Sequence, residues 1–390
     1  MRFSSRVLRV RPSATLAMNA KAQELKAKGQ SVISLAVGEP DFPTPEHVKQ
    51  AAKEALDADF TRYTPVPGIP ELRRAVAGYF KRFYGVEAPM EAVIVSNGGK
   101  QALFNLFLSL LNNGEEVLMP APYWVSYPEM VLLAGGVPVP VPTSPEQGFL
   151  ARVEDLDKAC TPGTRILMLN SPSNPTGGCY SQAQLDAIME WAISRKIFVI
   201  SDEIYDQLVY APAEAASCAK WWAKNPESVA VVNGLAKSFA MTGWRVGYAL
   251  AHPDLIKTQA KIQGQSTSNI CSIAQKAALA ALTGPYDSVQ TMRAAFLRRR
   301  DLALEIMAGW PGVECLKPGG AFYLFPKVNA CFTSQAPDSG KLCEWILEKA
   351  LVALVPGAAF GDDRCVRLSY AVGDETLIRA LEAVGKVLKA

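Results

Sequence analysis

A lysine and an arginine lie eight residues apart in the segment 234–247, among small and apolar residues. Lys237 follows the apolar run 229–233, which is typical of a strand buried on both faces of a sheet. Its amine is either solvated in a loop or held in a dry site, where desolvation lowers the pKa of a lysine and frees it for Schiff-base chemistry. Arg245 adds a second cation in the same apolar surroundings. Two such cations suggest a shared anion, for which phosphate is the natural candidate.

Polar side chains also follow two other apolar runs. Asn-Ser-Pro-Ser-Asn-Pro-Thr-Gly at 170–177 has the Pro and Gly pattern of a tight loop, and Ser-Asp-Glu-Ile-Tyr occupies 201–205. Open α/β sheets bind ligands beyond the carboxyl ends of their strands, so both segments are candidate site segments. Plainer interpretations remain, because 170–177 can be an ordinary turn and Asp202 can cap a following helix.

The motifs of several other enzyme classes are missing. The chain has no G-x-G-x-x-G, G-x-x-x-x-G-K-[ST], H-E-x-x-H or G-x-S-x-G, so hydride transfer and nucleotide hydrolysis have no motif to support them. Its two histidines, His47 and His252, and its eight scattered cysteines lack the spacing of metal ligands. We therefore expect no metal site.

The order of the apolar runs predicts an α/β fold. Short runs alternate with helical stretches, and this β-α-β rhythm predicts a mainly parallel central sheet covered by helices. After residue 284 the pattern changes to that of a smaller α+β part, which begins with a long Arg-rich helix over 285–307. The expected strands are 92–96, 116–120, 137–141, 165–170, 197–201 and 229–233, then 321–325, 352–355 and 365–370. The other expected helices are 100–111, 125–133, 181–194, 340–349 and 375–387.

The composition is that of a folded protein with a large core. The 390 residues are 49% apolar and 20% charged, which excludes a disordered chain, a collagen and a disulfide mini-protein. The 40 Lys+Arg and 37 Asp+Glu give a net charge of +3, so neither nucleic acid nor a membrane surface is an expected partner. No apolar run reaches the roughly 18 residues of a membrane helix. Scattered cysteines and a start unlike a signal or transit peptide predict a cytoplasmic location.

In their order, these motifs resemble the class I aminotransferases, which are pyridoxal-phosphate enzymes of fold type I. The match covers essentially the whole chain and includes Val-Gly-Glu-Pro-Asp at 37–41, Asn-Pro-Thr-Gly at 174–177 and Arg367 in Val-Arg-Leu-Ser-Tyr. Gly-Lys-Gln-Ala-Leu-Phe at 99–104 and Tyr-Trp-Val-Ser-Tyr-Pro at 123–128 are similar to bacterial aspartate aminotransferases of subgroup Ib. The implied domains are an N-terminal arm with a segment of the small domain (1–45), a large cofactor-binding domain (46–285) and a small C-terminal domain (286–390).

The resemblance implies how the chain would hold pyridoxal phosphate. Lys237 would carry the cofactor and later move the substrate's Cα proton, and Asp202 would keep the pyridine nitrogen protonated. Trp124 would stack on the ring, while Tyr205 and Asn174 would bind the cofactor's 3′ oxygen.

The implied phosphate site combines a helix start with side chains. The residues expected there are Gly98, Gly99 and Lys100, then Ser238 and Arg245, and Tyr63 of a neighbouring subunit. A contribution from a neighbour implies a homodimer with shared sites. Gly234 occupies a position where many relatives have serine, three residues before the lysine, so one phosphate hydrogen bond is expected to be missing or replaced.

The implied substrates are amino acids and 2-oxo acids. Arg367 would pair with the α-carboxylate through two parallel hydrogen bonds, next to the backbone of Gly38, with Trp124 and Asn174 beside it. Animal-type aspartate aminotransferases bind the side-chain carboxylate with an arginine of the partner, but the corresponding stretch 263–272 has none. Lys100 is the subgroup Ib candidate for this role. Arg11 and Thr15 also match that subgroup, and relatives with Lys or Arg at position 11 include enzymes that accept prephenate.

The implied reaction is reversible amino transfer between L-aspartate and 2-oxoglutarate, giving oxaloacetate and L-glutamate. The alternatives are a bifunctional aspartate/prephenate or aromatic aminotransferase, or a carbon–sulfur lyase of the same fold. A transcriptional regulator would need a DNA-binding domain ahead of the matched region, which begins by about residue 6. A catalytically dead relative would be expected to have lost Lys237 or Asp202, and both are present.

Overall fold

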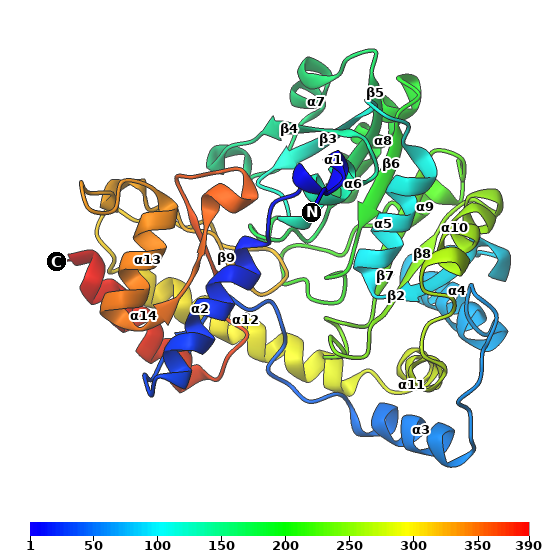
Figure 1. Ribbon diagram of the computed structural model, residues 1–390, viewed down its shortest axis with the longest axis horizontal. Helices are drawn as coiled ribbons and strands as arrows, with labels where there is room; N and C mark the ends of the chain where they lie inside the picture. The colour runs from blue at the N-terminus through cyan, green and yellow to red at the C-terminus, as the bar shows by residue number, and fades with distance from the viewer. Residues whose placement is uncertain (390) are drawn as a thin grey trace.

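A seven-stranded sheet forms the centre of the computed structural model, which describes residues 1–389 (Figure 1). Its strand order is β2-β8-β7-β6-β5-β3-β4. The pairs from β7 to β4 are parallel, whereas β8 is antiparallel to both β2 and β7. The mainly parallel sheet of the expected α/β fold is therefore confirmed. The strands are β2 (Val93–Asn97), β3 (Glu116–Ala121), β4 (Val137–Pro142), β5 (Thr164–Asn170), β6 (Phe198–Asp202), β7 (Val229–Gly234) and β8 (Val246–Leu250).

Both faces of this sheet are buried. Alternate residues of one strand enter different cores: Val93 and Val95 pack on one face and Ile94 on the other. This double burial explains why the strands are continuous apolar runs in the sequence. One face is covered by α3 (Glu46–Asp57), α4 (Pro70–Tyr84), α7 (Val153–Ala159), α8 (Gln182–Ser194), α9 (Ala219–Trp222) and α11 (Ser272–Thr283). The other is covered by α5 (Gly99–Leu110), α6 (Ser126–Leu133) and α10 (Pro253–Ser266).

The two ends of the chain share a third core. β1 (Ile33–Ser34) pairs in parallel with β10 (Val352–Ala353), and a small antiparallel sheet has the order β11-β12-β9. Figure 1 shows α2, near the N-terminus, beside the C-terminal helices. The division of the chain at 45 and 285 stays a prediction. The remaining elements of this part are α2 (Ala14–Ala27), α12 (Asp287–Met307), β9 (Tyr323–Leu324), α13 (Ser339–Ala350), β11 (Val355–Pro356), β12 (Val366–Ser369) and α14 (Asp374–Lys389).

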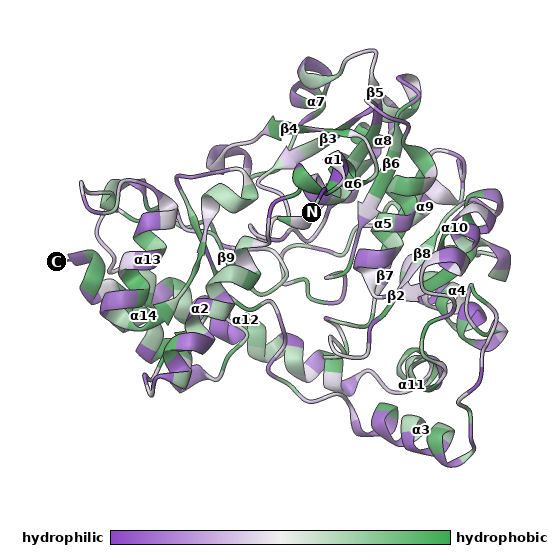
Figure 2. Ribbon diagram, in the orientation of Figure 1, coloured by the Kyte–Doolittle hydropathy of each residue, from purple (hydrophilic) through white to green (hydrophobic). Residues whose placement is uncertain are grey.

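Amphipathic helices and short turns complete the fold. In Figure 2 the outer helix α3 alternates between hydrophilic and hydrophobic colours, as expected for a helix with one face on the core. None of the helices within residues 1–389 has both the length and the apolar character needed to cross a membrane. Short helical segments are α1 (Ser5–Leu8) and the 3₁₀ turns Met90–Ala92, Pro145–Gln147, Asn329–Cys331 and Gly357–Phe360.

Some expected elements differ from those observed. The predicted strand 352–355 is two strands, because the chain leaves the pair with β1 and joins β12 after Leu354. The predicted strand 321–325 is reduced to Tyr323–Leu324, and the long helix begins at Asp287 rather than at 285. Strand β8 was not anticipated. Its pairing with β7 places Gly247 opposite Gly234 and sets the geometry of the turn between them.

Candidate active site

A cavity of about 490 Å³ lies where the strand ends of the central sheet meet the part built from the chain termini. Asn170 and Asp202, the last residues of β5 and β6, line one side of it. Tyr323 and Arg367 of the small antiparallel sheet line the other. The residues singled out from the sequence that line this cavity are Thr15, Gly38, Gly99, Lys100, Trp124, Asn174, Asp202, Tyr205, Lys237, Arg245 and Arg367.

Lys237 lies in the turn between β7 and β8 and presents its amine to the cavity. Its Nζ donates a hydrogen bond to the carbonyl oxygen of Gly38 at 2.6 Å. The ring centres of Tyr205 and Phe322 are 5.9 and 5.8 Å from Nζ. Burial lowers the pKa of Lys237 to about 8, although the Glu39 carboxylate opposes this shift. The amine is thus closer to its nucleophilic, neutral form than an exposed lysine at the same pH.

Asp202 is a buried carboxyl group held by two donors. The Tyr127 hydroxyl donates to Oδ2 at 2.7 Å, and the backbone N–H of Ile204 donates to Oδ1 at 3.2 Å. Burial raises the pKa of Asp202 to about 6, and the hydrogen bond from Tyr127 opposes the rise. The segment after Asp202 forms a turn rather than a helix, so the carboxylate is not a helix cap. At neutral pH it is mostly ionised and faces the cavity.

Arg367 is a buried cation without a counter-ion. It is 2% exposed, and no ion pair within residues 1–389 includes it. Nη2 donates to the carbonyl of Ala36 at 2.6 Å and Nη1 to Oδ1 of Asn174 at 3.1 Å, while Nε has no hydrogen-bond partner in the described chain. Burial lowers the pKa of Arg367. A buried guanidinium with spare donors can bind an anion from the cavity.

The start of α5 and Arg245 form a cradle with a positive potential. Gly98 has φ of 84° and precedes the helix, and a Cβ there would overlap the Arg245 guanidinium. Arg245 donates to the carbonyls of Asn97 (3.3 Å) and Thr242 (2.9 Å). Backbone N–H groups at a helix start and an adjacent guanidinium bind phosphate well. The residues present therefore fit a phosphorylated cofactor.

Gly234 has no room for the serine of many relatives. A Cβ at this position would lie 2.9 Å from both the Cα of Gly247 and the carbonyl oxygen of Val246 on β8. Such short approaches to backbone atoms do not occur without displacement of a strand. The close pairing of β7 and β8 is the physical reason for glycine here, and no side chain at this position can donate to a phosphate.

Lys100 and Trp124 are neighbours at the cavity. Nζ of Lys100 lies 4.8 Å from the centre of a Trp124 ring, within the range of a cation–π contact. Partial desolvation and the charge of Arg245 lower the pKa of Lys100. Trp124 in turn meets the Tyr127 ring edge-on, with centres 5.3 Å apart.

Four residues selected from the sequence do not line the cavity: Gly98, Ser238, Arg11 and Tyr63. Gly98 instead lies next to Arg245, directly before α5. Ser238 is buried, but it borders a separate hollow of about 290 Å³ beside Phe239, and its hydroxyl has no hydrogen-bond partner among residues 1–389. Ser238 therefore does not line the cavity in this structure, and its contribution to the phosphate cradle stays a prediction. Arg11 is exposed, and Tyr63 is 92% exposed. Neither reaches the cavity of its own chain.

Two tyrosines in the site were not assigned from the sequence. Tyr127, within the quoted motif at 123–128, contacts Asp202. The Tyr323 hydroxyl is 2.9 Å from that of Tyr205, and a Cβ on Gly38 would overlap it. For Tyr323 the available signal was a tyrosine within an apolar strand, since a buried hydroxyl usually has a hydrogen-bond partner.

The fold and this cavity define the class of the protein. The chain matches the aminotransferase class I and II family over residues 30–384 and belongs to that family.

Among individual relatives, the aspartate/prephenate aminotransferase of Thermus thermophilus is 47% identical, with 99% of this chain and 98% of the relative aligned. The aspartate aminotransferase of Bacillus subtilis is 42% identical, with 100% and 99% aligned. The solved structure of a Thermus thermophilus aspartate aminotransferase with maleate superimposes with a TM-score of 0.94 at 47% identity, covering 99% of this chain and 100% of that one. That of Rhizobium meliloti gives a TM-score of 0.96 at 37% identity, covering 100% and 99%.

Proposed function

We propose that this chain is a pyridoxal-phosphate-dependent aminotransferase that transfers the amino group of L-aspartate to 2-oxoglutarate, giving oxaloacetate and L-glutamate. The observation that carries the proposal is the placement of Lys237, Asp202 and Arg367 around one cavity. A partly neutral amine, a buried carboxylate and an uncompensated guanidinium are the groups that this reaction needs. Full-length similarity to aspartate aminotransferases supports the same conclusion.

The residues that would hold the cofactor surround the cavity. Lys237 would attach it through Nζ, and Asp202 would face its pyridine nitrogen as an anion. The start of α5 and Arg245 would hold its phosphate. When bound, the cofactor supplies an electron sink for the electrons of the broken Cα–H bond. Trp124, Asn174 and Tyr205 border the same space and would position its ring and 3′ oxygen.

Lys237 and Arg367 would then divide the work on the substrate. Arg367 binds the α-carboxylate with donors that the protein leaves free, and the backbone at Gly38 lies beside it. The amine of Lys237 would move the proton from the substrate's Cα to C4′ of the cofactor, because a lysine with a lowered pKa can act as base and then as acid. Burial of the site limits competition from water.

The side-chain carboxylate of the substrate is assigned to Lys100. Its ammonium lies at the cavity next to Trp124, and Thr15 lines the same region. Maleate, named for the Thermus thermophilus structure, is a dicarboxylate of the size of aspartate. Arg11 would have to turn inward from its exposed position to assist.

Prephenate is the second candidate amino acceptor. Several relatives, among them that of Thermus thermophilus, are named aspartate/prephenate aminotransferases. Prephenate is also a dicarboxylate, so the same pair of cations could bind it.

A homodimer is proposed because Tyr63 is exposed and does not line the cavity of its own chain, as expected for a residue that reaches the phosphate site of a neighbour. A cytoplasmic location is proposed because the eight cysteines are free thiols, as is usual in a reducing compartment.

The test is a panel of amino donors with 2-oxoglutarate or oxaloacetate as acceptor, with prephenate included. We expect the purified protein to be yellow and to transfer the amino group of aspartate. Borohydride should bleach the yellow colour of the unmodified chain and leave the cofactor covalently attached to a peptide that contains Lys237, whereas Lys237→Ala should retain no covalent cofactor after the same treatment. If the yellow protein does not transfer the amino group of aspartate, the assignment of aspartate as substrate is refuted. If Lys237→Ala binds covalent cofactor at the normal level, the assignment of Lys237 as the attachment site is refuted.

A further inference from the structure

The segment 36–44 connects β1 to α3 and passes the candidate active site. We call it the connecting segment. Hydrogen bonds at four of its residues hold it in place. Two of these bonds are made with residues of the site, Arg367 and Lys237. The contacts are Ala36 O with Arg367 Nη2 (2.6 Å), Gly38 O with Lys237 Nζ (2.6 Å), Asp41 Oδ1 with Arg299 Nη1 (2.7 Å) and Thr44 Oγ1 with Ala240 O (2.9 Å).

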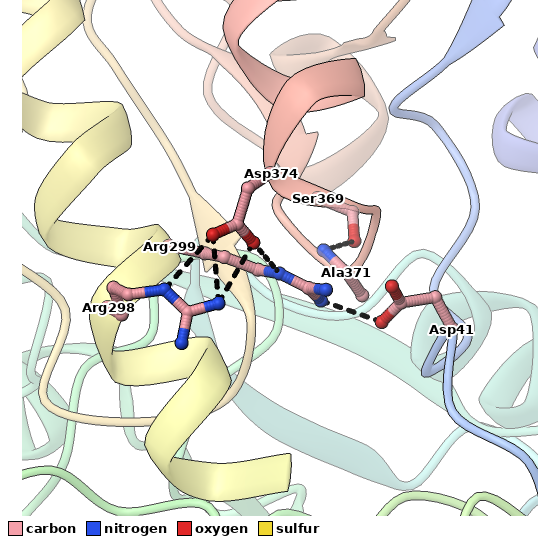
Figure 3. A network of polar contacts seen from close by, with 6 residues as sticks. All are labelled: Asp41, Arg298, Arg299, Ser369, Ala371 and Asp374. Carbon is pink, nitrogen blue, oxygen red and sulfur yellow. Dashed lines mark hydrogen bonds and ion pairs between the residues drawn. The ribbon is translucent and has the colours of Figure 1, made fainter.

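The third contact is a partly buried ion pair outside the cavity. Figure 3 shows Arg299 of α12 between Asp41 and Asp374, the first residue of α14. The Arg299 side chain is 8% exposed, and its Nε donates to Asp374 Oδ1 at 2.9 Å. The two carboxylates raise the pKa of Arg299 against the effect of burial. Its guanidinium also lies 5.5 Å from the Phe42 ring centre.

Through these contacts Arg299 holds the connecting segment in place at Asp41. A buried guanidinium strongly favours keeping its carboxylates, because loss of one leaves a charge unpaired in a poorly solvated place. Arg298, the neighbour of Arg299 in α12, also holds Asp374 through three hydrogen bonds, so both arginines tie α12 to the start of α14. Asp41 is three residues from Gly38, a span of at most about 10 Å. The short stretch of backbone between them can therefore transmit a shift of Asp41 to Gly38.

We propose that Asp41 and Arg299 are positioning residues for Lys237. Their ion pair holds the connecting segment so that the Gly38 carbonyl accepts the hydrogen bond from the free amine of Lys237. That bond orients the amine toward the cavity whenever the amine is not attached to cofactor, which is when it has to move the proton. The inference rests on the proposed function for its catalytic consequence, and its geometric part is independent of that function.

Two substitutions at Arg299's carboxylate partners form a matched pair. Asp41→Asn and Asp374→Asn each remove one negative charge from Arg299, but only the first weakens the link to the connecting segment. In crystals of the cofactor-free variants, we expect Gly38 O and Lys237 Nζ to lie beyond hydrogen-bond distance in Asp41→Asn and to stay bonded in Asp374→Asn. The thermal unfolding midpoints show whether the two variants are comparably destabilised.

The kinetic expectation follows from the same geometry. A charge-assisted hydrogen bond corresponds to roughly 10- to 100-fold in an equilibrium, so kcat for aspartate should fall about tenfold in Asp41→Asn. The isotope effect with Cα-deuterated aspartate should rise, because proton transfer becomes slower. KM and the calorimetric affinity for maleate should change less than about threefold, since Arg367 is still present. Asp374→Asn should leave kcat within about threefold.

Equal behaviour of the two variants in both the crystals and the isotope effect would overturn the proposal. If Asp41→Asn does not fold, Asp41→Glu moves the carboxylate by one methylene while it keeps the charge, and the same ordering against Asp374→Asn is expected. If Asp41→Asn shows the displaced Gly38 carbonyl but the unmodified chain transfers no amino group from any donor, the proposed function is refuted and the geometric part of the proposal stands.

Discussion

At the scale of single residues, burial moves two ionisable groups of the site in opposite directions. It raises the pKa of Asp202 to about 6 and lowers the pKa of Lys237 to about 8 in the cofactor-free chain. Between these values Asp202 is the anion that favours a protonated pyridine nitrogen. The cavity can therefore receive the cofactor in the required charge state near neutral pH, without any further charged group next to the ring.

The affinity for the cofactor should depend on the protonation of Asp202. The folded pKa lies above the ordinary value for aspartate, so the anion is present above about pH 6 and is lost as the pH falls through that value. We expect cofactor affinity, measured by absorbance titration, to weaken between pH 7 and pH 5. In Asp202→Asn the carboxylate part of this dependence should disappear, while titration of the cofactor's phosphate remains. An unchanged pH profile in that variant would contradict the role of Asp202.

Lys100 should act on dicarboxylates alone. If its ammonium meets the substrate's side-chain carboxylate, Lys100→Ala should lower kcat/KM for aspartate about 10- to 100-fold, the amount expected from a charge-assisted hydrogen bond of roughly 1.5–3 kcal/mol. Phenylalanine should be nearly unaffected, since Arg367 still binds the α-carboxylate. Equal losses for both donors would indicate a role in cofactor positioning, and no loss would leave only a backbone contribution from the start of α5.

At the scale of elements, the pairing of β7 with β8 shapes the turn that contains Lys237 and Arg245. Gly234 and Gly247 face each other across it, and Arg245 precedes β8 with a positive φ of 57°. The position of the guanidinium over the start of α5 thus depends on how closely two strands approach. Even a small side chain at Gly234 would force β7 and β8 apart.

Gly234→Ser should test that dependence. Its Cβ would approach the β8 backbone to 2.9 Å, and overpacking of this kind destabilises a protein by about 1–3 kcal/mol. We expect urea titration to show a lower free energy of unfolding and absorbance titration to show weaker cofactor binding. Gly243→Ala is the matched control, because a Cβ at Gly243 has no neighbour within 4 Å. A serine variant as stable as this control would show that the strands adapt freely.

The sequence allowed much of this element pattern to be predicted, for an identifiable reason. Strands buried on both faces are continuous apolar runs, so β5, β6 and β7 were located to within about two residues. Strand β8 has the same apolar character, but it follows directly on the Lys237 segment, which was interpreted only as a site motif. The split at Leu354 depends on which distant strand each half meets, and periodicity carries no information on that.

The order of the motifs along the chain was enough to select many of the residues that line the cavity. The sequence does not show in which direction each side chain points, so some selected residues do not line it. Ser238 follows Lys237 immediately, yet it lines another hollow. In an irregular turn the side chains do not alternate regularly as they do in a strand, so the sequence does not tell which of them face the cavity. The Tyr205–Tyr323 contact joins residues 118 positions apart, and nothing local in the sequence indicates it.

At the scale of the whole molecule, a complete site is proposed to need two chains. Co-expression of Tyr63→Ala with Lys237→Ala should restore activity above that of either variant alone. In a mixed dimer one cavity would combine an intact Lys237 with an intact Tyr63 from its neighbour, and the other would have both defects. If Tyr63 served its own chain, every cavity of the mixed dimer would have one defect, and no recovery would be observed. Analytical ultracentrifugation provides the independent measure of the dimer.

The parallel pair of β1 with β10 also has a consequence for synthesis on the ribosome. Ile33 pairs with Val352, so the early segment must wait for about 320 further residues before its partner strand has been made. At about 5–20 residues per second this delay is about 15 to 65 s. During that time the apolar residues Met18, Ala22 and Leu35 have no core to enter, while the central sheet can already assemble. The nascent N-terminus is therefore the part of this chain that chaperones would be expected to shield during translation.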